Sequence, residues 1–250
     1  MKALFEHPMG KAIKAGVTAL VLLTIGALSL SLGQKPHHLP ISEHFLHRDA
    51  YSLSYDGQHR QARWVYEHLT PEKLQGIAER EQHEFQEDPS LPSLIRSSKA
   101  DYAGSGFDRG HLCPAADARI SDQAMKETFY LSNISPQSPL FNRGYWAKLE
   151  KHVRNLTKVY GSLHVFSGPL YLPYTEANGK KYVKYEVIGA NNVGVPTHFF
   201  KMIFTESNSS WRLLEAYILP NESIDNKTPL ESFLSSMEKI ERLSGIIFTP

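Results

Sequence analysis

The sequence contains very little cysteine, with Cys113 as the single example in 250 residues. One cysteine cannot form an internal disulfide bond, and it excludes a zinc site built from several thiolates. Proteins without disulfides occur in every compartment, so the redox environment stays undetermined. Cys113 is either a reactive thiol or a small packed residue. We favour packing, because free cysteines are among the most buried residue types.

The sequence also lacks an excess of charge of either sign. Its 27 basic and 26 acidic side chains give a net charge of +1, and outside residues 1–34, which hold three lysines and one glutamate, 24 basic and 25 acidic side chains remain. No overall basic excess therefore predicts nucleic-acid binding. One segment differs, because residues 143–158 carry five basic side chains against one acid, Glu150: Arg143, Lys148, Lys151, Arg154 and Lys158. We expect this segment to form a helix whose basic side is either a phosphate-facing surface or an ordinary solvated face.

Internal repeats and low-complexity blocks are absent, which excludes a repeat architecture. A hydrophobic content of 41% with 21% charged residues is typical of globular proteins and excludes disorder over most of the chain. The length suits one large domain with an appendage, or two small domains.

Charged residues are missing from residues 15–33, and about 20 apolar residues can span a bilayer as one helix. Lys2, Lys11 and Lys14 precede this run, which predicts that the N-terminus stays on the cytosolic or matrix side and the body lies across the membrane. No clear small-x-small cleavage site is present, so we predict an uncleaved anchor in residues 1–34 rather than a removable signal peptide. A buried helix is disfavoured because the run is apolar on every face.

Residues 35–44 predict a linker, because Pro36 and Pro40 interrupt regular structure in a polar stretch. The histidines in and just after this stretch could form a metal-binding tract. Without cysteines or carboxylates in register, a histidine-rich linker is the better interpretation. We therefore expect the folded body to span residues 45–250.

Hydrophobic patterning predicts more strands than helices in the body. Strands are expected over residues 50–55, 62–69, 163–169, 182–188, 198–205 and 211–219. Helix-start signals predict one helix from Thr70-Pro71-Glu72 and another from Thr228 to Gly245. The predicted class is α+β, with helices packed on a central, largely antiparallel sheet. Residues 72–88 carry six acids against two basic side chains, so we expect them outside any phosphate-binding groove.

The segment that begins at Gly106 gathers the side chains with the most chemistry. His111 ends the run Gly106-Phe107-Asp108-Arg109-Gly110-His111, where the adjacent glycine lets the backbone approach a bulky ligand. A histidine with a pKa near ~6.5 can take a proton from water at neutral pH, as phosphodiester hydrolysis requires. Asp-Arg-Gly-His alone is a weak signal, because any exposed loop could contain it.

Asn142 and Glu150 could supply the oxygen ligands that a hard divalent cation prefers. Glu150 follows Asn142 by eight residues, roughly 12 Å along a helix axis, which suits contact through a metal-bound water. Alternatively, Asn142 caps the basic helix and Glu150 pairs with Arg154. Asn133 could equally be a turn residue that bonds its own backbone. The appearance of all these residues in this order favours a functional site.

Longer runs carry a specific resemblance to the DNA/RNA non-specific endonucleases of the ββα-metal class, closest to their endonuclease G branch. The similar segments are Tyr102–His111, Phe129–Asn133, Phe141–Trp146, Ser167–Pro173, Tyr182–Gly189 and Val195–Lys201. The resemblance covers nearly everything from about Tyr51 to the C-terminus. It implies a nuclease domain over residues 45–250 with a ββα-metal active-site motif.

The resemblance also implies a role for each motif residue. His111 would be the general base, and Asn142 would be the one direct protein ligand of a Mg²⁺ ion that Mn²⁺ can replace. Glu150 would hold a metal-bound water. Arg109 would contact the scissile phosphate or its neighbour, and Asn133 would order the site.

Three further residues complete the predicted site. Asp108 would hold the motif loop in shape. Arg80 is our candidate for a second, upstream arginine that stabilises the phosphate. Arg143, which begins the basic segment, is a further candidate for substrate binding.

These implications predict a Mg²⁺-dependent endonuclease that cleaves both DNA and RNA with little sequence preference. Arginine, lysine and metal contacts address the phosphate backbone, which carries no base information. One alternative is a catalytically silent nucleic-acid-binding relative, against which His111, Asn142 and Glu150 argue together. The other is a phosphodiesterase for a small or lipid substrate, suggested only by the anchor.

The location stays open between an organelle and a bacterial envelope. The endonuclease G branch implies the mitochondrial intermembrane space or inner membrane, and generally a homodimer. The N-terminus, however, has no arginine before Arg48 and carries Glu6, unlike an arginine-rich transit peptide. Lysines before an apolar run suit a bacterial export signal or anchor equally well, with a periplasmic or secreted domain. In each case the nuclease domain lies on the non-cytosolic side.

Overall fold

The computed structural model describes residues 43–207 and 210–249. The predicted anchor, residues 1–34, and most of the predicted linker lie outside the described residues. Within the described part of the chain, no helix is both long enough and apolar enough to cross a membrane.

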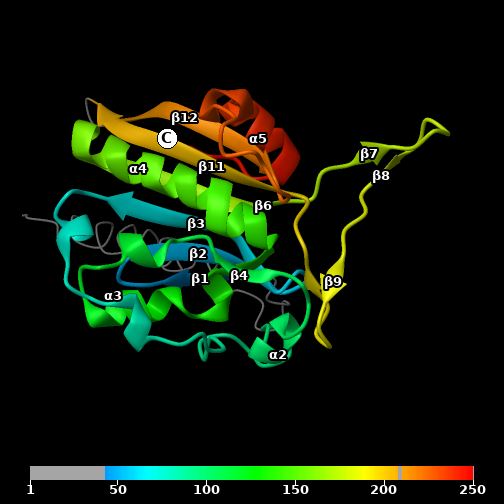
Figure 1. The fold of residues 1–250 in the computed structure, drawn as a ribbon, viewed down its shortest axis with the longest axis horizontal. Coiled ribbons are helices and arrows are strands. Elements are labelled where there is room, and N and C mark those ends of the chain that lie inside the picture. The colour runs from blue at the N-terminus through cyan, green and yellow to red at the C-terminus, as the bar shows by residue number, and fades with distance from the viewer. Residues whose placement is uncertain (1–42, 208–209, 250) are drawn as a thin grey trace, which may run out of the picture. The chain divides into compact units, whose positions relative to one another are not determined.

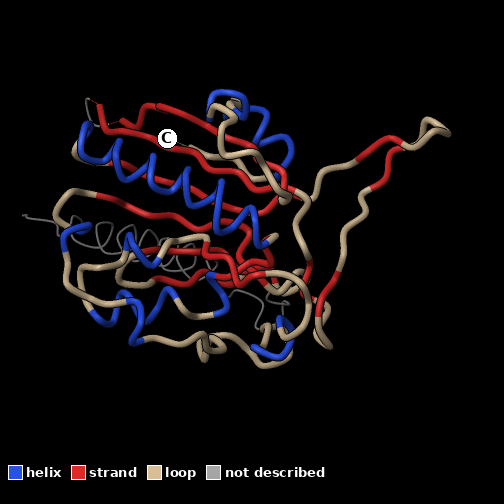
Figure 2. The backbone as a smooth tube through the Cα atoms, viewed as in Figure 1, coloured by secondary structure: helices blue, strands red, loops and turns tan. Residues whose placement is uncertain are grey.

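Six strands form one sheet whose neighbouring strands are all antiparallel (Figures 1 and 2). In spatial order they are β1 (His44–His47), β2 (Tyr51–Asp56), β3 (Gln61–Leu69), β6 (Leu163–Leu170), β11 (His198–Ser207) and β12 (Ser210–Pro220). The sheet confirms the α+β class and five of the predicted strands. The sequence did not predict β1, because its four residues include two histidines and give no clear apolar alternation.

Shorter elements surround this sheet. They are α2 (Lys99–Tyr102), β4 (Asp108–His111), α3 (Asp122–Thr128), β5 (Ile134–Gln137), the π-helical turn η5 (Phe141–Trp146), α4 (Ala147–Tyr160), β7 (Tyr174–Thr175), β8 (Lys181–Tyr182), β9 (Val187–Ile188), β10 (Val193–Gly194) and α5 (Met237–Ser244). Short 3₁₀ turns η1 (Lys73–Gln75), η2 (Arg80–Gln82), η3 (Ala115–Asp117), η4 (Leu131–Asn133) and η6 (Leu230–Phe233) connect some of them.

Side chains alternate along the strands, so the sheet has two buried faces. Val165 packs in one core, which α4 covers through Leu149. Phe204 packs in a second core on the opposite face, where Ile240 of α5 is buried. The two helices therefore cover different faces of the sheet, and Figure 1 shows them apart.

β4 and β5 form a separate antiparallel pair, and the helix that begins in η5 follows them, which gives the predicted ββα arrangement. The pairing needs a glycine at position 110, because a Cβ atom there would lie 2.1 Å from Oε1 of Gln137. Trp146 Nε1 donates a hydrogen bond to the carbonyl oxygen of His111 at 3.2 Å. This bond ties the end of β4 to the helix that follows.

The helix predicted from Thr70 is wrong. The chain makes only η1 and η2, with the residues between them outside any helix. Gly76 runs against the backbone of Arg119, where an added Cβ atom would lie 1.6 Å from the carbonyl oxygen. Ala78 N also donates to this oxygen, at 3.4 Å. Tertiary contact with the 119–120 backbone thus overrides the local helix signals.

The strand predicted over residues 182–188 is also wrong in extent. Only its two ends pair, as β8 with β7 and β9 with β10, and the residues between are unpaired. The β7–β8 hairpin projects away from the sheet in Figure 1. Since an alternating segment forms a continuous strand only beside a partner strand, this stretch does not become one. A turn joins β7 to β8, with Gly179 N donating to the carbonyl oxygen of Glu176 at 2.9 Å.

The last helix begins later than predicted. Ser236 rather than Thr228 caps it, since the Ser236 side chain accepts a hydrogen bond from Lys239 N. The preceding residues bond to β12 instead, with a bridge from Leu234 to Tyr217 and a bond from Ser235 N to Ala216 O at 2.8 Å. The predicted end is confirmed, because Gly245 takes the left-handed conformation at φ 69°.

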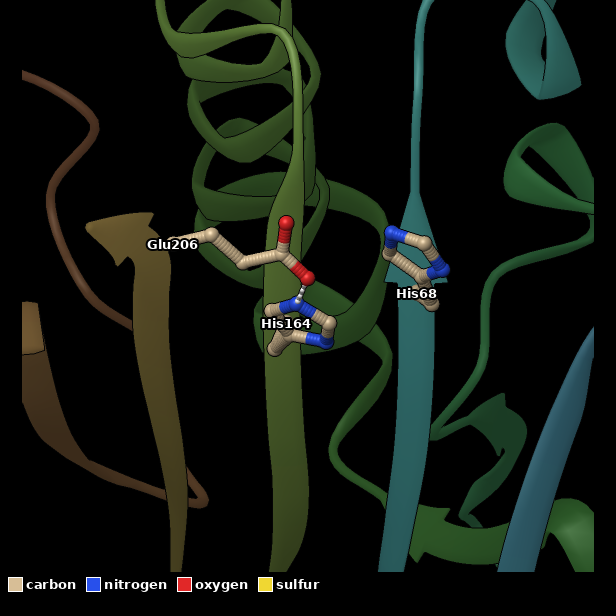
Figure 3. Close-up of side chains that lie close together, drawn as sticks. All are labelled: His68, His164 and Glu206. Carbon is tan, nitrogen blue, oxygen red and sulfur yellow. Dashed lines mark hydrogen bonds and ion pairs between the residues drawn. The ribbon is translucent and has the colours of Figure 1, made fainter. Parts of the chain in front are cut away.

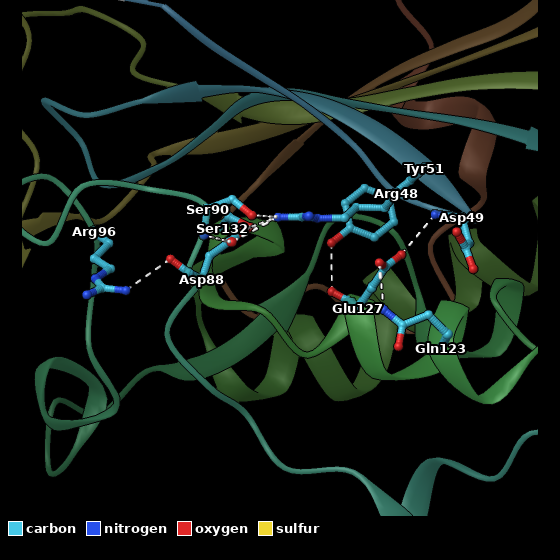
Figure 4. Close-up of polar contacts among 9 residues, drawn as sticks. All are labelled: Arg48, Asp49, Tyr51, Asp88, Ser90, Arg96, Gln123, Glu127 and Ser132. Carbon is cyan, nitrogen blue, oxygen red and sulfur yellow. Dashed lines mark hydrogen bonds and ion pairs between the residues drawn. The ribbon is translucent and has the colours of Figure 1, made fainter.

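A buried ion pair joins Arg48, which lies between β1 and β2, to Asp88, which precedes the motif of β4 in the chain (Figure 4). Arg48 Nη2 donates to both oxygens of Asp88, at 2.8 and 2.7 Å, and Ser132 Oγ donates to Asp88 Oδ2 at 2.5 Å. The Asp88 side chain has no exposed surface, and that of Arg48 is 12% exposed. Arg96 Nη1 adds a bond to the Asp88 carbonyl oxygen at 3.2 Å.

We expect Arg48→Ala to lower the free energy of unfolding by about 3–5 kcal/mol, because it leaves the buried Asp88 carboxylate without its counter-charge. Urea unfolding at neutral pH measures this loss. Arg242→Ala is the matched control, since the Arg242–Glu238 pair is 75% and 78% exposed and is worth roughly 0.5 kcal/mol or less. Equal effects of the two substitutions would contradict the prediction.

Candidate active site

A cleft of about 390 Å³ lies where the end of β4 meets the start of the basic helix and the 80–85 segment. Its lining residues are Arg80, Phe85, Asp108, Arg109, His111, Pro114, Ala115, Ala116, Asn142, Arg143, Ala147 and Glu150. The structure therefore brings together every predicted site residue except Asn133.

His111 is the last residue of β4 and is 7% exposed. Its Nε2 atom is buried and has no hydrogen-bond partner among the described residues. The rings of Phe85 and Phe129 flank it at centroid distances of 5.4 and 5.2 Å. Burial, and then the nearby charge of Arg80, lower the pKa of His111 to about 3. The imidazole is thus neutral at neutral pH, which is the form that can accept a proton.

We expect this burial to make folding stability depend on pH. Because the pKa of His111 is lower in the folded than in the unfolded chain, the unfolded chain binds more protons between about pH 3 and 6.5, and stability falls as pH falls through that range. His111 should contribute a loss of about 2 kcal/mol between pH 8 and pH 5. In urea unfolding, the His111→Asn variant should not show this part of the pH-dependent loss of stability. The control is His47→Asn, a substitution at an exposed site, which should keep it. The same pH-dependent loss in His111→Asn and in the wild type would contradict this assignment.

Two arginines face the cleft without a carboxylate partner among the described residues. The Arg109 guanidinium lies over the ring of Phe85, with its Cζ atom 4.5 Å from the ring centroid. The Arg80 guanidinium lies 5.9 Å from the centroid of Phe129. Both side chains belong to exposed residues. Since aromatic rings hold these two cations in place of anions, their charge remains available to a phosphate.

Arg143 is differently placed, because Asp108 binds it. Arg143 Nη2 donates to Asp108 Oδ1 at 2.6 Å, and its Nε donates to Oδ2 at 2.8 Å. Asn142 Nδ2 donates to Asp108 Oδ2 at 2.9 Å. Partial burial raises the pKa of Asp108, but these hydrogen bonds outweigh it and lower the pKa overall. Asp108 therefore stays ionised and joins the motif strand to the start of the helix.

Asn142 lies within the π-helical turn η5, so the alternative that it caps the helix is wrong. Its backbone N–H already donates to the carbonyl oxygen of Ser138 at 2.8 Å. Because Asp108 accepts from the amide nitrogen, the amide oxygen is the atom left for another partner.

Glu150 lines the same cleft from the first turn of α4. The alternative that it pairs with Arg154 is wrong, because Arg154 Nη1 donates to Asp117 Oδ1 at 2.9 Å instead. Burial raises the pKa of Glu150 to about 7, with Lys201 opposing and Asp117 adding to the rise. An incoming cation would favour the ionised carboxylate.

Asn133 lies behind the cleft and is fully buried. Its Oδ1 accepts from Cys113 N, and its Nδ2 donates to the carbonyl oxygens of Cys113 and Thr128, each at 2.9 Å. These partners are distant in sequence or lie outside its own turn, so Asn133 fixes the segment that follows His111. Cys113 is buried as well, and burial raises the pKa of its thiol.

The sequence interpretation missed two contributions to the cleft. The acid-rich stretch 72–88 was expected to lie outside it. The structure instead places Phe85 of this stretch in the lining, beside Arg80, which was the candidate for the upstream arginine. The ring of Phe129 was also not assigned to the surroundings of His111. The sequence does place Phe85 close to Arg80 within this acidic stretch, and aromatic faces bind guanidinium groups. This proximity was the signal that could have assigned Phe85 to the site.

A ββα motif with a histidine, an asparagine and unpaired arginines in one cleft defines a metal-assisted nuclease architecture. The chain belongs to the DNA/RNA non-specific endonuclease family, whose model matches residues 30–250. It is therefore an enzyme of the hydrolase class that acts on nucleic-acid phosphodiester bonds.

Named relatives agree with this family. Human "Endonuclease G, mitochondrial" is 51% identical over 203 residues, which cover 81% of this chain and 68% of the relative. "Nuclease C1" of Cunninghamella echinulata var. echinulata is 48% identical over 208 residues, or 82% of each chain. The solved EndoG/EndoGI complex contains a chain that is 45% identical, with a TM-score of 0.80 over 84% of this chain and 87% of that one. The predicted closeness to endonuclease G is confirmed.

Proposed function

We propose that the protein is a Mg²⁺-dependent, sequence-non-specific endonuclease of DNA and RNA, with His111 as its general base. The observation that carries this proposal is a single cleft that holds the neutral imidazole of His111 together with two arginines without carboxylate partners, an asparagine and a glutamate. A protein that only binds nucleic acid has no use for a neutral, buried base beside potential cation ligands.

The neutral imidazole of His111 accepts a proton from the water that attacks phosphorus. Its neutral state favours this step, since a protonated imidazole could not act as a base. The flanking rings of Phe85 and Phe129 hold the imidazole in one orientation. Asn133 supports this geometry indirectly through its bonds to Cys113.

Arg109 and Arg80 bind the phosphate oxygens on either side of the attacked bond. Guanidinium groups suit phosphate because they present several donors in one plane. Contacts of this kind read the backbone and carry no base information, which accounts for cleavage without sequence preference. Arg143, already engaged by Asp108, contributes charge at the rim.

The residues of the cleft fit a hard divalent cation. Asp108 accepts a hydrogen bond from the amide nitrogen of Asn142, which leaves the amide oxygen of Asn142 to bind the cation. Glu150 offers a carboxylate to a metal-bound water. Mg²⁺ prefers such oxygen ligands and keeps several waters, and Mn²⁺ accepts the same donors. When bound, the ion would neutralise charge that develops on the phosphoryl oxygens.

Incubation of the purified protein with supercoiled plasmid and with RNA, each with Mg²⁺, tests this function. We expect nicking of the plasmid and degradation of the RNA, both prevented by a chelator. Plasmid that is retained on the protein but never nicked would instead identify a silent binding relative. Hydrolysis of a small phosphodiester alone would identify the phosphodiesterase alternative.

We further propose a mitochondrial location, with residues 1–34 as the targeting or anchoring segment and a homodimeric nuclease domain on the non-cytosolic side. Human and bovine endonuclease G carry the word mitochondrial in their names, as does human nuclease EXOG, which is 43% identical. Fusion of residues 1–40 to a reporter protein measures the subcellular location and the orientation across the membrane. Delivery of the reporter to the cytosol would contradict the proposal, and sedimentation measures the dimer.

A further inference from the structure

A second group of potential metal ligands lies at one end of the central sheet (Figure 3). His68 of β3, His164 of β6 and Glu206 of β11 each offer one ligand atom, and these atoms all lie within 4.8 Å of one another. The strand register creates this cluster, since His68 is directly opposite His164 and β11 pairs with β6 on its other side.

This cluster and the nuclease cleft lie on opposite faces of the sheet. Side chains alternate along a strand, so His164 points to the face opposite Val165, which packs in the core that α4 covers. Trp211 and Phe166 of the second core pack beside the cluster, and the ring of Trp211 stacks on that of His164 at a centroid distance of 4.0 Å. A ligand bound here would therefore not enter the cleft.

His164 is already positioned as a metal-binding histidine. Its Nε2 atom lies 2.8 Å from Glu206 Oε1, and its Nδ1 atom lies 2.8 Å from the hydroxyl of Tyr66. When the Nδ1–H group donates to Tyr66, the lone pair on Nε2 faces the carboxylate of Glu206. A cation replaces this direct contact and binds both groups once the exposed Glu206 side chain moves back to make room for it. Metal-ligating histidines commonly have their second ring nitrogen held by such a hydrogen bond.

His68 supplies the third ligand after a rotation of its ring. Its ring stacks on that of His164 at 4.6 Å and 9°, and two parallel rings cannot share an ion that lies in both planes. His68 is only partly buried, and its ring contacts are Ser162 Oγ at 3.0 Å and Lys73 Nζ at 3.5 Å.

We propose that His68, His164 and Glu206 bind one divalent transition-metal ion of the Zn²⁺ type. Two imidazoles and one carboxylate suit Zn²⁺, whereas Mg²⁺ prefers the oxygen ligands of the cleft. Three protein ligands leave a coordination position for water. The ion links β3, β6 and β11 at the edge of the molecule, so binding stabilises the folded sheet without supplying a group to the nuclease reaction.

Zn²⁺ titration of the full-length protein by calorimetry tests the site. The protein is purified in detergent without a histidine tag, stripped with a chelator, and saturated with Mg²⁺ to occupy the cleft. We expect one Zn²⁺ per chain and a rise in Tm. His68→Ala and Glu206→Gln, both at accessible residues, should each weaken Zn²⁺ binding by at least about tenfold and abolish the rise in Tm. In Co²⁺-loaded protein, the same variants should lose the visible absorption of a nitrogen-ligated ion.

Three control variants locate the ion. Asn142→Ala changes the nuclease cleft, His47→Ala removes an exposed histidine, and a double alanine variant at His37 and His38 removes two of the three histidines in residues 35–44. All three should bind Zn²⁺ like the wild type. The proposal is overturned if the wild type binds no Zn²⁺, if His68→Ala and Glu206→Gln bind it unchanged, or if binding is lost in one of the controls.

Discussion

Replacement of His111 with alanine is expected to lower the rate of plasmid nicking by about 10²–10⁴-fold, the usual contribution of a general base. Among the described residues, His111 is the one histidine that lines the cleft. Removal of the ring leaves Arg109 and Arg80 in place, so substrate binding should persist. Single-turnover nicking at saturating Mg²⁺ measures the loss, and filter retention of the same plasmid measures binding.

Two further measurements make this result specific. His47→Ala, at an exposed histidine far along the chain from the motif, should nick at the wild-type rate. Imidazole added to His111→Ala should restore part of the activity if the missing group is a base, whereas a folding defect would not respond. Wild-type nicking by His111→Ala would show that another group activates the water.

Replacement of Asn142 with alanine should lower the nicking rate by at least about 100-fold at moderate Mg²⁺ concentration. A directly bound cation is worth several kcal/mol of transition-state charge stabilisation, and each 1.36 kcal/mol is tenfold in rate. The Mg²⁺ concentration for half-maximal activity should rise as well, which a purely structural defect would not produce. A titration of activity against Mg²⁺ measures both effects.

Asn155→Ala is the matched control, because it makes the same substitution at an exposed position of the following helix α4. It should leave the rate and the Mg²⁺ dependence unchanged. If Asn142→Ala keeps the wild-type half-maximal Mg²⁺ concentration, Asn142 is not a ligand. Its bond to Asp108 at 2.9 Å would then be its main contribution.

Local sequence was sufficient for the parts of the fold in which neighbouring residues determine conformation. The strands predicted over residues 50–55 and 62–69 are present as β2 and β3, and they pair with each other. Gly245 ends the last helix as predicted because its left-handed conformation is an intrinsic property of glycine.

Local signals failed where a distant segment competed for the same backbone groups. Thr70-Pro71-Glu72 has the residues of a helix start, but the chain leaves helical geometry where Gly76 passes the backbone of Arg119. Thr228 has the residues of a helix cap, but the following residues bond to β12 and delay the helix to Met237. In both cases the competing contact comes from a residue that no local pattern reveals.

The sequence by itself determined which chemical groups the cleft contains, because His111, Asn142 and Glu150 occur in contiguous, recognisable segments. It also determined the family, which the resemblance named and the comparisons confirm. Only the tertiary structure placed Phe85 beside the predicted Arg80 in the cleft and Asn133 behind it. It alone brought His68, His164 and Glu206 together, since the pairing of β3, β6 and β11 joins residues 96 and 42 positions apart. Strand pairing is a long-range interaction, and its register is fixed by the packing of whole faces rather than by the residues that it brings into contact.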